Sequence, residues 1–168
     1  TDAIMLSGET AAGKYPVEAV KMMATIAKRT EETLDYDRLL KENGTNNVTV
    51  TDAISHATCT TAVDLNASAI ITSTQSGATA GRLSQCRPDC PIVAVTPDEK
   101  VAKKLALCFG VYPVVSGQMQ STDHMMEESV KVAEANGFVK TGDTVVIAAG
   151  VPVDKIGATN LLKISVVE

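Results

Sequence analysis

Aromatic side chains are scarce in this sequence, which has no tryptophan and only 3% aromatic residues in a chain of 168. We therefore expect Val, Ile, Leu, Ala and Met to fill the core. Positive charge is not in excess either, because the formal net charge is -5 at pH 7. A chain without a basic face does not attract a nucleic-acid backbone or an anionic membrane, so neither is expected as a partner.

Long apolar runs are also missing. No stretch approaches the roughly 18 to 20 residues that cross a bilayer, and the first residues do not resemble a signal peptide. These absences predict a cytoplasmic protein. The few cysteines have none of the spacings of a metal or redox pair, so we expect reduced thiols and no metal site. They are Cys59, Cys86, Cys90 and Cys108.

What the sequence does contain is a regular alternation of helical and strand patterns after residue 50. It predicts a three-layer α/β/α domain with a five-stranded, mostly parallel sheet, because strands such as 91–96 are apolar on both faces. The last strand follows a loop too short for a parallel crossover, so we expect it to be antiparallel at the edge. The expected helices are 51–65, 77–87, 98–108 and 121–136, and the expected strands are 68–73, 91–96, 111–115, 143–149 and 160–167.

Other patterns precede this domain. Residues 1–6 have the apolar character of a strand. Apolar side chains then recur with a helical period over 16–34, with a proline in the first turn, where proline is tolerated. Residues 35–50 are polar, which predicts a linker. The expected division of the chain is therefore 1–34, 35–50 and 51–168.

The segment Gly8–Lys14 satisfies the opening positions of the phosphate-binding P-loop pattern. The next position of that pattern requires Ser or Thr to hold Mg²⁺, and this chain has Tyr15 followed by Pro16 there. The preceding strand also lies too near the start of the chain to belong to a nucleotide-binding sheet. We therefore reject a P-loop.

The same opening, Asp2–Val20, resembles the last barrel strand and helix of the pyruvate kinase family in its bacterial form. The resemblance continues through Arg87-Pro88 and Gly157–Asn160 to the end of the chain. It implies that residues 1–34 close a (β/α)8 barrel and that the remainder is the family's C-terminal regulatory and subunit-contact domain. The chain is then expected to be a fragment of a longer enzyme.

Members of this family transfer a phosphoryl group from phosphoenolpyruvate to ADP in glycolysis, giving pyruvate and ATP, with Mg²⁺ and K⁺ as cofactors. The resemblance places the metal ligands, the catalytic lysine and the ADP-binding residues before Thr1. The chain by itself is therefore expected to hold no cofactor and to be inactive. Its expected partners are a phosphorylated small molecule and other pyruvate kinase subunits, in a homotetramer.

Ser7 and Glu9 are what the resemblance leaves of the active site in this chain. They are similar to family residues near the site that protonates the enolate, at the end of a barrel strand, where barrel enzymes place their chemistry. We expect supporting catalytic roles for both in the whole enzyme. The alternative is that Glu9 and Thr10 only cap the turn that follows.

A second candidate site lies where the first strand of the α/β domain leads into a helix. This segment is rich in hydroxyl groups and offers free backbone amides at a helix N-terminus, which attracts anions. The resemblance implies that it binds the phosphate of an effector. The alternative is that the hydroxyl groups cap only their own helix. The candidate phosphate ligands are Ser73, Thr74, Gln75, Ser76, Gly77, Ala78 and Thr79.

The effector is expected to carry one phosphate. In relatives that bind fructose 1,6-bisphosphate, a basic residue early on a later helix holds the second phosphate, but the corresponding helix here has Glu127 and Glu128, which would repel it. AMP or a sugar monophosphate is therefore favoured. The loop before the last strand should fold over the ligand, with Lys155 as its charged contact. The alternative is that this loop is an ordinary mobile connection. The loop residues concerned are Gly150, Val151, Pro152, Lys155 and Gly157.

His56 and His124 have no candidate ligand partners in the sequence, so packing or surface roles are expected for both. The alternative to an enzyme fragment is a free-standing module that binds phosphometabolites and has no kinase activity. Such a module would have no use for the amphipathic helix over 16–34, whereas the end of a barrel must carry one.

Overall fold

The computed structural model describes residues 1–43, 49–117, 119, 121–153 and 159–168. Its helices are α1 (Gly8–Ala11), α2 (Pro16–Glu31), α3 (Tyr36–Glu42), α4 (Val50–Asp64), α5 (Ala78–Gln85), α6 (Glu99–Leu105) and α7 (Thr122–Ala135). Its strands are β1 (Ala69–Ser73), β2 (Ile92–Thr96), β3 (Val111–Val115), β4 (Thr144–Ala149) and β5 (Leu161–Val166).

The strands form one sheet with the order β3-β2-β1-β4-β5. The first four are parallel to one another, and β5 runs antiparallel to β4 at the edge. In the middle of the sheet, Ile71 of β1 lies between Val93 of β2 and Ile147 of β4. The predicted five-stranded, mostly parallel sheet with an antiparallel last strand is confirmed.

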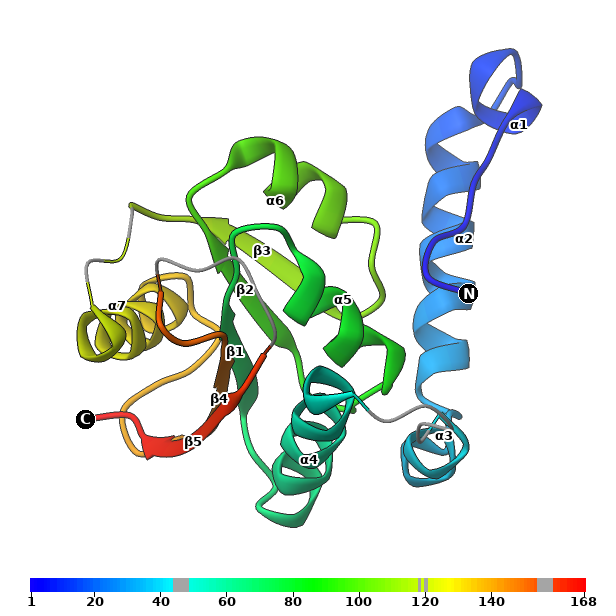
Figure 1. Ribbon diagram of the computed structural model, residues 1–168. Helices are drawn as coiled ribbons and strands as arrows, with labels where there is room; N and C mark the ends of the chain where they lie inside the picture. The colour runs from blue at the N-terminus through cyan, green and yellow to red at the C-terminus, as the bar shows by residue number, and fades with distance from the viewer. Residues whose placement is uncertain (44–48, 118, 120, 154–158) are drawn as a thin grey trace.

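Helices cover both faces of this sheet, which gives the predicted three layers. Figure 1 shows α4 and α5 on one side of the sheet and α7 on the other. Successive strand residues point to opposite faces, so Ile70 packs with Leu83 of α5, whereas Ile71 packs with Met125 of α7. All four of these side chains are at most 2% exposed. The core is aliphatic and sulfur-containing, as the shortage of aromatic residues predicted.

The chain reverses its winding direction at β1. From β1 it passes through α5 on one face to β2, and it returns from β3 through α7 on the other face to β4, which lies on the opposite side of β1. Ligands of open α/β sheets bind at such a switch point, outside the carboxyl ends of the strands. In this fold, that place is the end of β1 beside the end of β4.

Residues 1–6, predicted to be the last strand of a barrel, are not assigned to a strand in this structure. A strand is held by hydrogen bonds to a neighbouring strand, and in the described part of the chain no strand pairs with this segment. The linker predicted over 35–50 needs correction as well, since it contains α3. Asp35 caps this helix by accepting a hydrogen bond from the Arg38 amide at 2.9 Å, and Leu40 packs into the core with 7% exposure.

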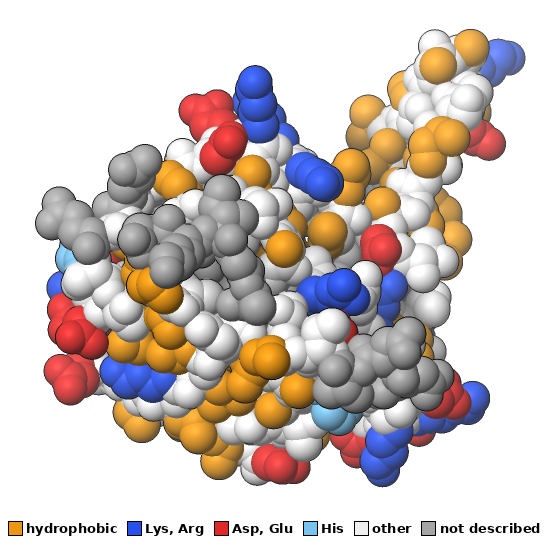
Figure 2. Space-filling model, viewed as in Figure 1, with side chains coloured by type: hydrophobic (Ala, Val, Ile, Leu, Met, Phe, Trp, Pro, Cys, Tyr) orange, Lys and Arg blue, Asp and Glu red, His pale blue; other side chains and the backbone are white. Residues whose placement is uncertain are grey.

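The helix predicted from Pro16 is confirmed as α2, which projects from the body of the molecule (Figure 1). None of its residues is buried. Its apolar side chains are open to solvent (Figure 2), with Val17 at 59%, Met22 at 61% and Ile26 at 58% exposure.

No helix among the described residues is long and apolar enough to cross a bilayer.

A capping box begins α4. The Thr49 hydroxyl accepts from the Asp52 amide at 3.2 Å, and an Asp52 carboxylate oxygen accepts from the Thr49 hydroxyl at 2.7 Å and from the Thr49 amide at 3.2 Å. Arg82 of α5 lies 3.3 Å from the second carboxylate oxygen. The hydrogen bonds from Thr49, with the charge of Arg82, hold the pKa of Asp52 below its ordinary value.

Replacement of Asp52 by asparagine should therefore destabilise the domain at neutral pH more than at acid pH. A carboxylate with a lowered folded pKa adds stability above its unfolded pKa and loses it as the pH falls through the folded value. Urea unfolding between pH 6 and pH 3 should show the difference between wild type and D52N shrinking with falling pH. Thr49→Val should remove part of the same contribution, and a difference independent of pH would contradict this assignment.

Candidate functional site

The turn between β1 and α5 (residues 74–77, the β1–α5 turn) lies at the carboxyl end of the sheet. The Thr74 amide extends the ladder by donating to the Val95 carbonyl at 2.9 Å, and the Thr74 hydroxyl accepts from the Gly77 amide at 3.0 Å. Gly77 has φ +83°, in the left-handed region. A side chain there would place its Cβ 3.2 Å from Leu105 and 3.3 Å from Val101. The turn thus requires glycine for both its conformation and its packing.

Backbone amides are presented where α5 begins. The Ala78 amide donates to the Ser76 hydroxyl at 3.4 Å, so the local hydroxyl groups satisfy part of the helix end, as the capping alternative expects. The next two amides, of Thr79 and Ala80, have no hydrogen-bond acceptor among the described residues. Of these two N–H groups at the positive end of the helix dipole, that of Ala80 has no exposed surface, so the Thr79 amide is the one that an anionic oxygen can approach.

The hydroxyl groups of this segment divide into inward and outward sets. Thr74 and Thr79 are only 6% and 7% exposed, and their hydroxyls are engaged inside the protein. The Thr79 hydroxyl lies 2.8 Å from that of Thr159. Ser76 is exposed, as are Gln75 and Ala78, while Ser73 is half-buried. Ser76 is thus the hydroxyl best exposed for a ligand in solution.

The structure brings the β1–α5 turn together with the connection between β4 and β5. The Gln75 side-chain amide donates to the Val153 carbonyl at 3.1 Å, beside the contact between Thr79 and Thr159. Asn160 holds this connection by accepting from the Val151 amide at 2.8 Å and donating to the Val151 carbonyl at 2.7 Å. Of the predicted loop residues, Gly150, Val151 and Pro152 lie here, whereas Lys155 and Gly157 lie outside the described residues.

Sequence reasoning missed Thr159 and Asn160 as residues that position the site. Thr159 is 1% exposed, and its hydroxyl joins the connection to α5 across 80 positions of the chain. The usable signal was Asn160 immediately before a strand, because an asparagine side chain can both accept from and donate to the backbone of one residue.

Ser7 and Glu9 lie apart from this turn. Figure 1 places α1 at the far end of the projecting α2. The Glu9 carboxylate accepts from the Ser7 amide at 3.1 Å, and the Thr10 hydroxyl donates to the Ser7 carbonyl at 3.1 Å. Hydrogen bonds from the backbone amides of Glu9 and Ser7 lower the pKa of Glu9. The geometry is that of the capping alternative, with Ser7 and Glu9 both exposed.

The predicted acidic helix is α7. Ser121 begins it by accepting from the His124 amide at 3.2 Å. Glu127 and His124 are exposed, and Glu128 is half-buried. His56 is half-buried on α4, and its Nδ1 has no partner among the described residues. Over these same ranges, no three His, Cys, Asp or Glu side chains are grouped so that they could hold a metal ion.

The cysteines are free thiols, and two of them, Cys59 and Cys86, are buried. Burial, with the nearby Asp89, raises the pKa of Cys90 to about 11. A thiol with such a pKa is almost fully protonated at neutral pH and is a poor nucleophile. The structure therefore gives Cys90 a packing role.

Comparison with known proteins identifies the family to which this sequence is similar. A family model described as the α/β domain of pyruvate kinase matches residues 52–165. A pyruvate kinase from Clostridium acetobutylicum is 53% identical over all of this chain and 36% of its own length. One from Geobacillus stearothermophilus is 49% identical over 99% of this chain and 29% of its own length. This chain thus spans about a third of the length of these curated relatives.

The fold recurs in a solved structure. The crystal structure of a pyruvate kinase from Cryptosporidium parvum superposes with a TM-score of 0.87 and 31% sequence identity. The match covers 98% of this chain and 32% of the other. Both the projecting N-terminal helices and the α/β domain are therefore included in the likeness.

Proposed function

The chain belongs to the pyruvate kinase family, and from that premise we propose that it is the part of the enzyme that binds a phosphorylated effector and contacts other subunits. The whole enzyme would transfer phosphoryl from phosphoenolpyruvate to ADP in the cytoplasm. Residues 1–34 would complete its catalytic barrel, 35–50 would connect, and 51–168 would form the regulatory domain. The observation that supports the effector role is the Thr79 amide, which has no acceptor among the described residues, beside the exposed Ser76 at the switch point of the sheet.

The proposed ligand is a phosphoryl group seated at the N-terminus of α5. One of its oxygens would accept a hydrogen bond from the Thr79 amide, and the exposed Ser76 hydroxyl would donate a further one. The helix dipole favours a negative charge at this position. Gln75 and Asn160 would keep the β4–β5 connection beside the ligand. Gln75 bonds this connection to the β1–α5 turn, and Asn160 bonds one part of the connection to another.

A single phosphate fits the charges better than two. Ala78 is exposed and brings no charge to the start of α5, and α7 carries Glu127 and Glu128 where a second phosphate would need a cation. AMP and ribose 5-phosphate are therefore the preferred probes. Lys155 stays a predicted contact of the phosphate.

The catalytic machinery is proposed to lie in the rest of the enzyme. The described residues do not group carboxylates as a Mg²⁺ site requires, so no step of the reaction is assigned to metal in this chain. We propose that Mg²⁺ and K⁺ are bound by other parts of the enzyme, that this chain is inactive without them, and that Ser7 and Glu9 support the active site from the end of the barrel.

Ser76→Asp should weaken the binding of ribose 5-phosphate at least tenfold, which is about 1.4 kcal/mol. The new carboxylate would stand at the α5 N-terminus and repel the phosphate, while exposure of Ser76 leaves the fold intact. Isothermal titration calorimetry on the whole enzyme measures the change. Gln85→Glu adds the same charge at the other end of α5 and should change the affinity less than twofold.

The same titrations test the preference for one phosphate by ranking the affinities of different ligands. Ribose 5-phosphate or AMP should bind more tightly than fructose 1,6-bisphosphate. The reverse order would contradict the argument from Glu127 and Glu128. An affinity for ribose 5-phosphate that is equal in wild type and S76D would show that the β1–α5 turn is not the site.

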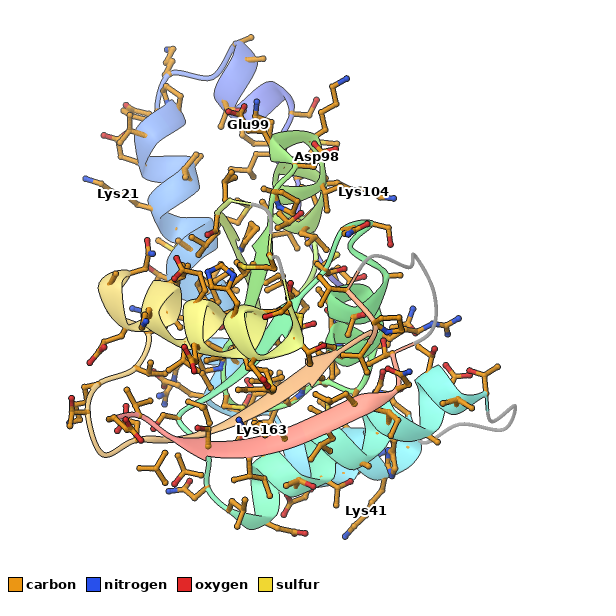
Figure 3. The ribbon with its side chains drawn as sticks, turned by 60° about the vertical axis from the view of Figure 1, so that its left-hand side comes forward. Lys21, Lys41, Asp98, Glu99, Lys104 and Lys163 are labelled. Atoms are coloured by element: carbon orange, nitrogen blue, oxygen red, sulfur yellow. The ribbon has the colours of Figure 1, made fainter. Side chains whose placement is uncertain are left out.

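The subunit contact is proposed to involve β5. Among the described residues, this strand has a neighbour on only one side, and Figure 3 shows it on the outside of the sheet, with Lys163 labelled on it. Ile164 and Val166 are 49% and 58% exposed. An open edge with apolar side chains suits pairing with the same strand of a second subunit about a twofold axis. Such pairing would supply one contact of a homotetramer.

A further inference from the structure

The two ends of α5 are tied to different parts of the molecule. Its N-terminus carries the proposed phosphate site. Beyond its C-terminus stands Arg87, whose guanidinium is 2.6 Å from the carboxylate of Asp2 in the N-terminal segment. Asp2 precedes Ser7 and Glu9 by only a few positions. A single short helix therefore connects the phosphate site with the segment proposed to support the active site.

Arg87 is held in place by contacts other than its ion pair with Asp2. Its backbone has φ +55°, a left-handed conformation that is unusual for arginine. Its guanidinium stands 4.7 Å from the centre of the Phe109 ring and donates to the Ser84 carbonyl at 3.3 Å. The side chain is only 17% exposed. Most ion pairs at a surface contribute little because two flexible side chains must be ordered, but here the arginine is already ordered.

The body of α5 is packed against the sheet and against α4. Ala80 and Leu83 are fully buried against the sheet. The Ser84 hydroxyl donates to the Phe109 carbonyl at 2.7 Å, and Arg82 reaches Asp52 of α4 at 3.3 Å. These contacts run along the length of α5 and join its phosphate end to the end that carries Arg87.

We propose that the ion pair between Arg87 and Asp2 couples the β1–α5 turn to the segment of Ser7 and Glu9. This inference rests on the proposed effector function. An effector that moves α5 changes the position of Asp2, and a substrate that orders the segment of Ser7 and Glu9 changes the affinity for the effector by the same factor.

Asp2→Asn in the whole enzyme tests the coupling, because asparagine keeps the shape of the side chain and removes its charge. The readout is the ratio of the half-saturating phosphoenolpyruvate concentrations without and with saturating ribose 5-phosphate. A wild-type ratio of fivefold or more should fall below twofold in D2N and in Arg87→Gln. The double variant should fall no further, because both changes remove one contact.

Glu42→Gln is the matched control. It removes another ion pair, between Glu42 and Arg38 at 2.7 Å on α3, with the same change of charge. Its ratio should stay within twofold of the wild-type ratio. A D2N enzyme that keeps the wild-type ratio, or an E42Q enzyme that loses it equally, would overturn the proposal.

A second measurement needs no ligand. Ser76→Asp perturbs the turn at an exposed position, and hydrogen–deuterium exchange of the whole enzyme reports on the amides of residues 3–10. The substitution should change their exchange at least threefold in the wild-type background and less than 1.5-fold in the D2N background. Equal changes in both backgrounds would refute the coupling. If ribose 5-phosphate does not bind wild type, the proposed effector function fails, while the exchange experiment still decides the role of the ion pair.

Discussion

Replacing Gly77 by valine is expected to lower the free energy of unfolding by about 2 to 5 kcal/mol and to abolish the binding of ribose 5-phosphate. A left-handed conformation costs a residue with a side chain roughly 1 to 2 kcal/mol, and forcing atoms into packed space adds about 1 to 3 kcal/mol. Both costs apply, since Gly77 has φ +83° and a Cβ there would lie 3.2 Å from Leu105. Urea denaturation and calorimetry measure the two losses.

Gly81→Ala is the control for this prediction, because it changes a glycine in the same helix. An added Cβ at Gly81 has no heavy atom within 4 Å, and the position is in the helix interior. Alanine should therefore stabilise the protein by up to about 1 kcal/mol. Equal destabilisation by G77V and G81A would show that α5 tolerates no substitution at all, and the specific requirement for a left-handed glycine would be wrong.

Ile164→Lys together with Val166→Lys should weaken the association of the whole enzyme on the order of 100-fold, which is about 2.7 kcal/mol. Both side chains lie on the open edge strand, and burying a lysine without a partner in an interface is costly. The fold should persist, since the two residues are 49% and 58% exposed. Sedimentation velocity over a range of concentrations measures the change.

Leu107→Lys serves as the control for the interface. Leu107 is an exposed apolar residue, at 66%, and lies beyond the end of α6, at the opposite side of the sheet from β5. Its replacement should leave the association unchanged. A double variant of β5 with the molecular mass of the wild-type enzyme would remove β5 from the subunit contact.

Most of the α/β domain could be predicted because its helices and strands have recognisable local sequence patterns. Ile92–Thr96 is apolar at its first four positions, and the predicted strand 91–96 differs from it by one residue. The end of β1 and the start of α5 are marked by Ser73 and Gly77, so the position of the turn was also predictable. Local patterns suffice here because each helix shows its own helical period of apolar residues and each central strand is a short apolar run.

The sequence-based predictions differ from the structure where contacts between residues distant in the chain decide the local structure. Residues 1–6 are apolar enough for a strand, but no strand among the described residues pairs with them. The charged residues of α3 predict a linker, and only its contact with α4 reveals that Leu40 belongs to the core. The burial of one leucine cannot be read from a seven-residue segment in which four residues are charged.

The sequence by itself determined the family, the order of the elements and the glycine-marked turn that precedes α5, because these depend on residue types and their spacing along the chain. Only the tertiary structure decided which groups of that turn face a ligand. It turned Thr74 and Thr79 inward, left the Thr79 amide without an acceptor among the described residues, and set Thr159 and Arg87 beside residues far away in sequence. The physical reason is that hydrogen bonds and ion pairs act over a few ångströms in space, and distance along the chain does not set them.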